Sequence, residues 1–385
     1  MRSTKAIIHL ENLKSNIKQI KALTKKGRLF LCPVKANAYG HGILECAKAA
    51  LEAGADCLSV ATTEEGILLR QNGIKCPILL FSLCSIDEVE DCVYYKITPF
   101  VFDRDYILMF EEACNKSHVK KFPLHLAVDT GMGRIGCYPE DVEELVKTIS
   151  STKHLFLEGM CTHLCVSDSL KEEDKIYTQK QKELFLQAIE NAKKAGANPK
   201  ICHMANSAAS LSLPDFHMDM IRPGIIIYGY YPDEITKKYL EDNGIKIDLK
   251  PVMTLETQVC AIRHLKKGMS VSYGRTWTAT EDTDIAVLPI GYGDGFLRRN
   301  ASSGIQVAIN GKNYPVRGRI CMDQCMVDIG KNSNVKRWDK AVIFGAKEDG
   351  ALQNANDIAL MTNTISYEVT TCISQRVPRI YTDLD

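Results

Sequence analysis

The residue with the clearest capacity for covalent chemistry is Lys35. The apolar, strand-like run Leu29–Val34 ends at this lysine, and a small-residue loop containing Gly40 and Gly42 follows it. At the carboxyl end of a parallel barrel strand, a lysine points into a partly desolvated cavity, which lowers its pKa below about 10.4. A neutral amine there can form a Schiff base with a carbonyl compound. A strand-end lysine that only reaches toward water is the common alternative, and this segment alone leaves both open.

Two later loops could bind a phosphate group. One apolar run leads into Asn206 and Ser207, and another leads through Arg222 into Gly224 and Ile225. Ser207 offers a hydroxyl at a predicted helix start, while Gly224 and Ile225 offer backbone N–H groups with little steric cover. Barrel enzymes often bind phosphate with the loops after strands seven and eight. A plain helix cap is the alternative for Asn206 and Ser207. Together with the amine of Lys35, a phosphate site indicates pyridoxal 5′-phosphate (PLP).

The elements that would position these residues alternate along the first 245 residues. Short apolar runs predict eight strands, and periodic segments between them predict helices. Eight βα units in succession favour a (β/α)8 barrel of the TIM type, with a six- or seven-stranded open sheet as the competing structure. The predicted strands are Leu29–Val34, Cys57–Ala61, Ile78–Ser82, Thr98–Phe102, Pro123–Val128, Leu157–His163, Ile201–Met204 and Met220–Arg222. The predicted helices are Leu44–Ala53, Thr63–Gln71, Ser85–Tyr94, Tyr106–Cys114, Pro139–Ile149 and Glu172–Ala195.

The pattern changes near Asn243-Gly244, where β-rich runs separated by glycine-containing turns become dominant. We therefore predict a barrel domain over residues 1–245 and a mostly β domain over residues 246–385, giving an α/β-plus-β chain. A short helix is predicted over Ala355–Met361. The predicted strands of this second domain are Val252–Ile262, Ile285–Ile290, Ile305–Ile309, Met322–Ile329 and Ala341–Phe344.

The composition is that of an ordinary soluble enzyme and excludes several other classes. The net charge of the 385 residues is +1, which gives no electrostatic case for nucleic acid or an anionic membrane as partner. No apolar run approaches the roughly 20 residues that span a bilayer, and the first ten residues do not resemble a secretion signal. We expect a cytoplasmic protein whose 15 cysteines are free thiols. Cys161, His163 and Cys165 would share one strand face, but no second cysteine pair has zinc-like spacing, so we expect no metal.

Motifs spread along most of the chain resemble fold-type III PLP enzymes, and specifically the alanine racemase family. The lysine segment and the Cys-Met-Asp-Gln segment are together highly specific. The motifs are Val34–Gly42, Asp129–Gly136, Thr162-His163, Asn206-Ser207, Arg222–Gly224, Tyr273-Gly274, Gly291–Gly295, Gly318–Gln324 and Ile365–Glu368.

The resemblance implies a role for each residue in these motifs. Lys35 would hold PLP and act as one catalytic base, and Tyr273 would be the second base on the opposite face. Arg134 and the backbone of Met322 would bind the substrate carboxylate, in a segment that includes Asp323. In this family Tyr273, Met322 and Tyr292 come from the partner subunit, so the active unit would be a homodimer. The cofactor would be bound by Tyr39, His163, Asn206, Ser207, Arg222, Gly224, Ile225 and Tyr367.

The implied function is the interconversion of L-alanine and D-alanine, which would supply D-alanine for peptidoglycan. A serine or broad-specificity racemase on the same frame is one alternative, although the bulk of Tyr367 favours a small side chain. A fold-type III decarboxylase would place a carboxylate at the pyridine nitrogen, where the resemblance places Arg222, which cannot accept a proton. A non-catalytic PLP carrier built as a lone barrel would not need the β domain that carries Tyr273.

The sequence departs from the family pattern at Ala127, where many members have a lysine that is sometimes carbamylated and fixes the following arginine. Alanine can do neither, so the orientation of Arg134 would depend on another group. The N-terminal residues Lys5–Ile7 replace a common Trp-x-Glu, and Gly293 replaces a frequent alanine.

Overall fold

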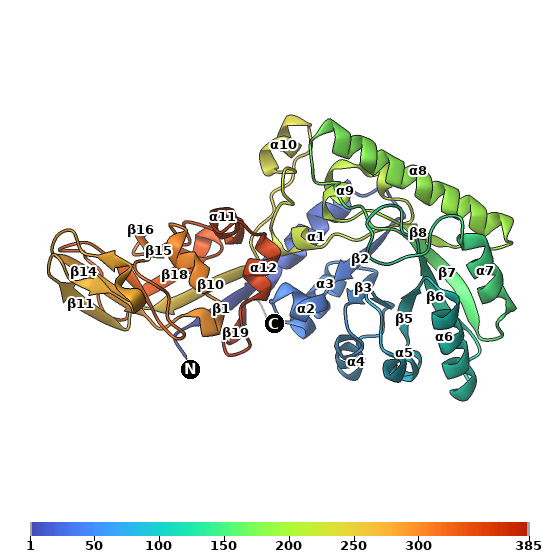
Figure 1. The fold of residues 1–385 in the computed structure, drawn as a ribbon, viewed down its shortest axis with the longest axis horizontal. Helices are drawn as coiled ribbons and strands as arrows, with labels where there is room; N and C mark the ends of the chain where they lie inside the picture. The colour runs from blue at the N-terminus through green and yellow to red at the C-terminus, as the bar shows by residue number, and fades with distance from the viewer. Residues whose placement is uncertain (1, 383–385) are drawn as a thin grey trace.

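The computed structural model describes residues 2–382 and contains a helix-covered barrel beside a β-rich domain (Figure 1). None of the helices in this part of the chain combines the length and the apolar character that a membrane crossing requires. The eight-stranded parallel sheet and the separate β-rich domain confirm the predicted class, an N-terminal (β/α)8 barrel with a mostly β C-terminal domain.

Eight parallel strands form the barrel wall in the order β8-β7-β6-β5-β4-β3-β2-β9. Between β8 and β9 the wall is closed by hydrogen bonds from Asp219 N to Cys202 O (3.0 Å) and from Arg222 N to Ala205 O (2.9 Å). The strands are nearly continuous apolar runs because both of their faces are covered. They are β2 (Leu29–Pro33), β3 (Cys57–Val60), β4 (Ile78–Leu80), β5 (Ile97–Val101), β6 (Phe122–Ala127), β7 (Leu155–Cys161), β8 (Ile201–His203) and β9 (Met220–Ile221).

Amphipathic helices cover the outside of the barrel. Helix α6 is representative: the side chain of Asp103 caps it by accepting a hydrogen bond from Tyr106 N, and Phe110 belongs to its buried stripe. The helices of this domain are α1 (Leu10–Leu23), α3 (Ile43–Glu52), α4 (Thr63–Gln71), α5 (Val89–Tyr94), α6 (Arg104–Lys116), α7 (Val142–Ser151), α8 (Glu172–Lys194), α9 (Ser207–Ser212) and α10 (Lys237–Asp242).

The second domain is built on a six-stranded sheet in the order β16-β15-β18-β10-β1-β19. Its strand β1 (Lys5–His9) comes from the start of the chain and lies between β10 and β19, so both ends of the chain meet in this sheet. A three-stranded sheet, β11-β14-β17, and the pair β12-β13 complete the domain. The other elements are β10 (Met253–Gln258), β11 (Ala261–Leu265), β12 (Ser270–Val271), β13 (Trp277–Thr278), β14 (Thr283–Leu288), β15 (Gln306–Ile309), β16 (Lys312–Pro315), β17 (Cys325–Asp328), β18 (Lys340–Phe344), β19 (Arg379–Thr382), α11 (Ala355–Met361) and α12 (Ser366–Thr371).

The predicted single strand Val252–Ile262 is two strands in different sheets. The chain changes sheets at Val259, whose N–H bonds Asp339 O (3.0 Å), while the N–H of Cys260 bonds Val287 O (2.9 Å). A continuous run of β-favouring residues does not reveal such a change, because the pattern within a strand does not specify which strand it pairs with.

A buried carboxylate joins the start of the chain to the loop that carries Tyr292. The side chain of Asp294 is fully buried and accepts hydrogen bonds from Arg2 Nη2 (2.9 Å), Arg376 Nε (2.6 Å) and Gly291 N (3.0 Å). Although burial alone would raise the pKa of Asp294, the hydrogen bonds from Arg2 and Arg376 lower it. Arg376 also contacts Asp323 (2.6 Å), so one network fixes both loops.

Substituting Asp294→Asn is expected to lower the free energy of unfolding by about 1–3 kcal/mol, because two arginines lose their charged acceptor. The folded-state pKa is lowered, so the wild-type contribution is present above about pH 4 and is lost as the pH falls further. Thermal unfolding at pH 7 and at about pH 2 measures both effects. Asp282→Asn, at an exposed lysine-paired carboxylate in the same domain, is the control, and an equal loss of Tm there would contradict the assignment.

Candidate active site

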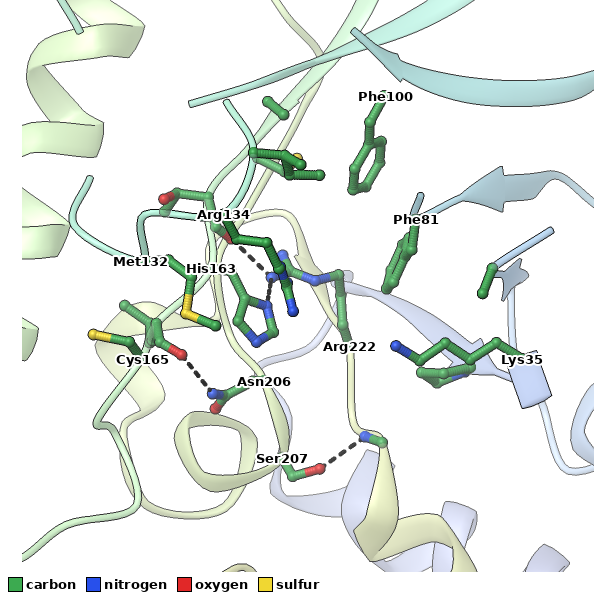
Figure 2. Close-up of a pocket in the computed structure, with 18 of the residues that line it drawn as sticks. Lys35, Phe81, Phe100, Met132, Arg134, His163, Cys165, Asn206, Ser207 and Arg222 are labelled. Carbon is green, nitrogen blue, oxygen red and sulfur yellow. Dashed lines mark hydrogen bonds between the residues drawn. The ribbon is translucent and has the colours of Figure 1, made fainter. Parts of the chain in front are cut away.

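A cavity of about 560 Å³ opens at the carboxyl ends of the barrel strands, a size suited to a small cofactor together with a substrate. Figure 2 shows Lys35 pointing into it from one side, opposite Arg222 and His163. Of the predicted site residues, those that line the cavity are Lys35, Tyr39, Arg134, His163, Asn206, Ser207, Arg222, Gly224 and Tyr367. Ile225 is buried directly after Gly224 and is absent from the lining.

Lys35 is followed by a left-handed turn that is costly for L-amino acids. Ala36, Asn37, Ala38 and Tyr39 all have φ between 52° and 54°. Each such residue costs roughly 1–2 kcal/mol compared with the right-handed conformation. Strain of this kind persists only when the surrounding structure compels it, and it concentrates at functional sites.

Contacts from three other segments hold this turn. The Glu65 carboxylate accepts hydrogen bonds from Asn37 N (3.2 Å) and Ala61 N (2.9 Å). The Asn37 side chain in turn accepts one from the N–H of the first residue of α3 (2.9 Å). From β19, near the end of the chain, Arg379 Nε donates to Gly40 O (2.9 Å). These contacts explain how four strained residues stay in place and fix the direction of the Lys35 side chain.

The surroundings of Lys35 favour its neutral amine. Burial lowers the pKa of Lys35, and the positive charges of Arg134 and Arg222 lower it further, against a smaller opposing effect of Glu65. A lowered pKa increases the fraction of the amine that is unprotonated and nucleophilic.

A small polar cradle lies around Gly224. Ser207 Oγ accepts a hydrogen bond from Gly224 N (2.8 Å), and Asn206 caps α9 through Ala209 N (3.2 Å). A Cβ at position 224 would lie 3.0 Å from the Tyr39 hydroxyl and 3.4 Å from Ser207 Oγ, so the glycine keeps this space open. Hydroxyl and N–H groups around an open space suit a phosphate group, and the residues present therefore fit PLP.

Two tyrosines border the same cradle and keep their protons. The ring centroids of Tyr39 and Tyr367 are 5.7 Å apart. Burial raises the pKa of Tyr367 to about 12 and raises the pKa of Tyr39 still further from its ordinary value. Both phenols are therefore hydrogen-bond donors at neutral pH, as an anionic ligand requires.

Arg222 and His163 form the wall opposite Lys35. Arg222 Nη2 donates to Thr162 O (2.8 Å) and lies 3.4 Å from His163 Nδ1. Burial lowers the pKa of Arg222 to about 10, so the guanidinium remains charged at neutral pH. Burial and the neighbouring Arg222 lower the pKa of His163 to about 3, which keeps its imidazole neutral.

Arg134 projects from a glycine-rich loop that Asp129 organises. The Asp129 carboxylate accepts backbone hydrogen bonds from Gly131 (2.8 Å), Met132 (2.9 Å) and Gly133 (3.0 Å). Within residues 2–382 no hydrogen bond or ion pair holds the Arg134 guanidinium itself, and Ala127 in the cavity wall offers no polar group. The fork of Arg134 is therefore available to a carboxylate.

Four predicted site residues lie on the β domain and do not reach this cavity within one chain. Tyr273 is 66% exposed, Met322 is 52% exposed and Tyr292 is 38% exposed, and Asp323 lies beside Met322 on the surface. The Tyr273 turn is itself held in shape, because Ser272 (φ 65°) donates its hydroxyl to the backbone carbonyl of Arg319. Tyr273, Met322 and Tyr292 are therefore accessible on the surface of the single chain.

Sequence reasoning missed several groups around the cavity. Phe81 and Phe100 stack with ring centroids 5.0 Å apart, and the Arg222 guanidinium carbon lies 6.0 Å from the Phe81 centroid (Figure 2). Asp168 also lines the cavity, and burial raises its pKa. His203, which no motif singled out, contacts Arg222 directly at 2.7 Å. Aromatic and histidine residues near strand ends look like ordinary core in a sequence, so no local signal marked them.

The fold and the cavity define a two-domain barrel protein in which a buried lysine and a group of hydrogen-bond donors around Gly224 line one cavity. Two family models match the chain: "Alanine racemase, N-terminal domain" over residues 8–232 and "Alanine racemase, C-terminal domain" over residues 252–381. The chain belongs to the alanine racemase family, and it is an amino-acid racemase.

Individual relatives agree with this assignment. The alanine racemase of Treponema denticola is 46% identical over 100% of this chain and 99% of its own length, and that of Treponema pallidum is 40% identical over 99% and 100%. Among solved structures, alanine racemase from Clostridium difficile has a TM-score of 0.90 at 37% identity, covering 99% of this chain and 96% of that one. Alanine racemase from Streptomyces lavendulae has a TM-score of 0.92 at 32% identity, covering 100% and 98%.

Proposed function

We propose that this enzyme interconverts L-alanine and D-alanine with PLP as cofactor, using Lys35 and Tyr273 as two bases on opposite faces of the substrate. The observation that carries the proposal is the desolvated Lys35 amine in one cavity with the Gly224 cradle. PLP, when bound, draws the negative charge of the deprotonated Cα into its ring. The D-alanine produced would be used for peptidoglycan.

The barrel would hold the cofactor at both ends. The Lys35 amine would bind its aldehyde, and Tyr39, Ser207, Gly224, Ile225 and Tyr367 would bind its phosphate, with Asn206 capping α9 beneath. Arg222 would face the ring nitrogen, with His163 beside it. Arg222 has only hydrogen-bond donors, so it could not accept a hydrogen bond from a protonated ring nitrogen, and that nitrogen would stay unprotonated. The ring would then be a weaker electron sink, which would favour prompt return of the proton to Cα.

The second base would come from a partner subunit. We propose a homodimer in which the β domain, beginning near residue 246, presents Tyr273, Tyr292 and the Met322-Asp323 loop to the partner's cavity. The exposure of these side chains in one chain supports this arrangement. With one base on each face, the amine of Lys35 or the phenolate of Tyr273 would accept the Cα proton on one face, and the other group would donate a proton to Cα on the opposite face.

The substrate would be held by its carboxylate. The unpaired fork of Arg134 and the backbone of Met322 are the proposed contacts. The bulk of Tyr367 at the cavity wall favours the methyl side chain of alanine over larger ones. One solved relative, alanine racemase of Bacillus anthracis at 32% identity, is described with bound L-Ala-P.

The cofactor proposal predicts a yellow holoenzyme whose colour is fixed on Lys35 by borohydride. Peptide mass mapping after reduction should place the added mass on the Lys35 peptide alone, and unreduced protein is the control. The same preparation should racemise L-alanine faster than L-serine, L-lysine or L-arginine. Modification of a different lysine would overturn the cofactor assignment, and a preference for serine or the basic amino acids would replace alanine as the substrate.

A further inference from the structure

Arg222 is a buried cation without a neighbouring anion. It is 5% exposed, and in the described part of the chain no carboxylate oxygen lies within 4.0 Å of its guanidinium. Its partners are neutral acceptors: Thr162 O at 2.8 Å, Met204 O at 3.3 Å and His203 Nδ1 at 2.7 Å. Since buried charges are normally paired, the position of its counter-charge needs a physical explanation.

A chain of two imidazoles leads from Arg222 across the barrel interior to a carboxylate. His203 Nε2 lies within hydrogen-bond distance of His125 Nδ1 (2.9 Å), whereas His125 Nε2 lies 3.4 Å from Glu158 Oε2 without the geometry of a hydrogen bond. His203 is fully buried and His125 is 1% exposed, whereas the Glu158 side chain is 31% exposed. This series of side chains thus leads from the buried Arg222 guanidinium to a partly exposed carboxylate, and its members lie on the neighbouring strands β8, β7 and β6.

The protons in this chain can have only one arrangement while both histidines are neutral. Arg222 can only donate, so His203 Nδ1 must accept and the His203 proton must be on Nε2. That proton is donated to His125 Nδ1, which places the His125 proton on Nε2, facing Glu158. Burial, Arg222 and His125 all lower the pKa of His203, so His203 stays neutral. The donors of Arg222 and His203 therefore follow one direction along the chain, and the remaining proton, on His125 Nε2, lies on the side of Glu158.

The barrel accommodates the two imidazole rings through a glycine and a shift in strand register. A Cβ at Gly159 would lie 2.5 Å from His125 Cε1 and 2.5 Å from Ile201 O, so only glycine allows the His125 ring to lie there. The β6–β7 register also shifts between Leu124 and His125. Phe100 stacks against His125 with ring centroids 6.1 Å apart, which restricts the orientation of the imidazole.

We propose that His203 and His125 are positioning residues that hold the Arg222 guanidinium, and that Glu158 is its counter-charge at a distance. The carboxylate polarises His125, His125 polarises His203, and His203 becomes a stronger acceptor for Arg222. The guanidinium is then fixed against the Thr162 side of the barrel, with its remaining N–H groups directed to the cavity. This inference rests on the proposed function only in taking Arg222 to face the cofactor ring.

The proton arrangement can be measured without any variant. In protein labelled with 15N at histidine, the imidazole nitrogen chemical shifts of His203 and His125 should report protonated Nε2 and unprotonated Nδ1, in both cofactor-free and PLP-loaded protein. Single substitutions assign the signals. A proton on Nδ1 of either residue, or a charged imidazole at pH 7, would refute the proposal regardless of whether PLP binds.

A pair of variants of similar size tests the consequence for the cofactor. His125→Asn keeps an acceptor oxygen for His203, whereas His125→Leu removes it and leaves the His203 donor unpaired. We expect His125→Leu to weaken PLP binding by about 10- to 100-fold and to shift the pH at which the bound cofactor's visible band titrates. His125→Asn, which keeps the acceptor but loses the link to Glu158, should bind PLP nearly as wild type does and should shift the titration less than His125→Leu. Glu158→Gln, which removes the charge but keeps the shape, should shift the titration in the same direction by less.

The outcomes separate this proposal from the proposed function. If PLP is fixed on Lys35 but the asparagine and leucine variants have the same PLP affinity and the same titration, the relay is wrong and the cofactor assignment stands. If no PLP binds to wild-type protein, the proposed function fails, while the histidine spectra of the cofactor-free protein still decide the proton arrangement.

Discussion

Substituting Lys35→Ala is expected to abolish racemisation, with kcat/KM for L-alanine falling by about 10⁴-fold or more. The change removes the amine that would bind the cofactor and also one of the two proposed bases, and general acid–base catalysis alone contributes up to about 10⁴-fold. The structure gives the physical reason, because burial lowers the pKa of this amine and so makes a nucleophile available. Coupled or chiral-chromatographic assay of D-alanine measures the loss.

Two controls make this result specific. Lys35→Arg keeps a positive charge at the same place but cannot form a Schiff base, so it should be as inactive as Lys35→Ala. Lys48→Ala removes an exposed lysine paired with Glu45 on α3 and should leave the rate unchanged. Recovery of part of the Lys35→Ala activity by added methylamine is expected, because a small amine can enter the vacated space. Activity within tenfold of wild type in Lys35→Ala would exclude the lysine as base.

Substituting Tyr273→Phe is expected to slow interconversion of the enantiomers by about 10²–10⁴-fold. Exchange of the Cα proton with solvent should persist for one enantiomer and be lost for the other. In D2O, the enantiomer whose Cα–H faces Lys35 should still exchange that proton for deuterium. The enantiomer whose Cα–H faces the phenol should not. Because L- and D-alanine have equal free energies, overall kcat/KM must fall equally in both directions, so exchange into each unreacted enantiomer, measured by NMR, is the decisive measurement.

Tyr94→Phe is the matched control for Tyr273→Phe. Both tyrosines are exposed in the single chain, at 74% for Tyr94 and 66% for Tyr273, but Tyr94 lies on α5, on the outside of the barrel. It should behave as wild type in every assay. Equal loss of deuterium exchange from both enantiomers in Tyr273→Phe would show that the phenol is no face-specific base.

Much of the barrel could be predicted from sequence because its strands are buried on both faces. Such strands read as short apolar runs, and the runs near Leu29 and Cys57 end within one residue of β2 and β3. The partner of a strand is not encoded in its own pattern, however. Lys5–His9 therefore gave no sign that it lies between β10 and β19 in the sheet of the other domain.

The site was predictable where topology brings residues together. Lys35, Ser207 and Arg222 follow different strands of one barrel, and the carboxyl ends of those strands meet at one mouth. The proposed contribution of Tyr273 cannot be derived from a single chain, because it would require a partner subunit. The contacts of His125 and His203 were missed for another reason: a buried histidine next to apolar residues looks like packing until its hydrogen-bond partners are known.

The left-handed turn after Lys35 also sets an order of events in biosynthesis. Its clamp from Arg379 to the Gly40 carbonyl joins residues 339 positions apart, so the reactive lysine is synthesised long before the strand that secures it. A ribosome-bound chain that has completed only the barrel has no Arg379 to hold these four unfavourable backbone conformations. The contacts from Glu65 and from the start of α3 can therefore form with the barrel, whereas the contact from Arg379 can form only after β19 has been synthesised.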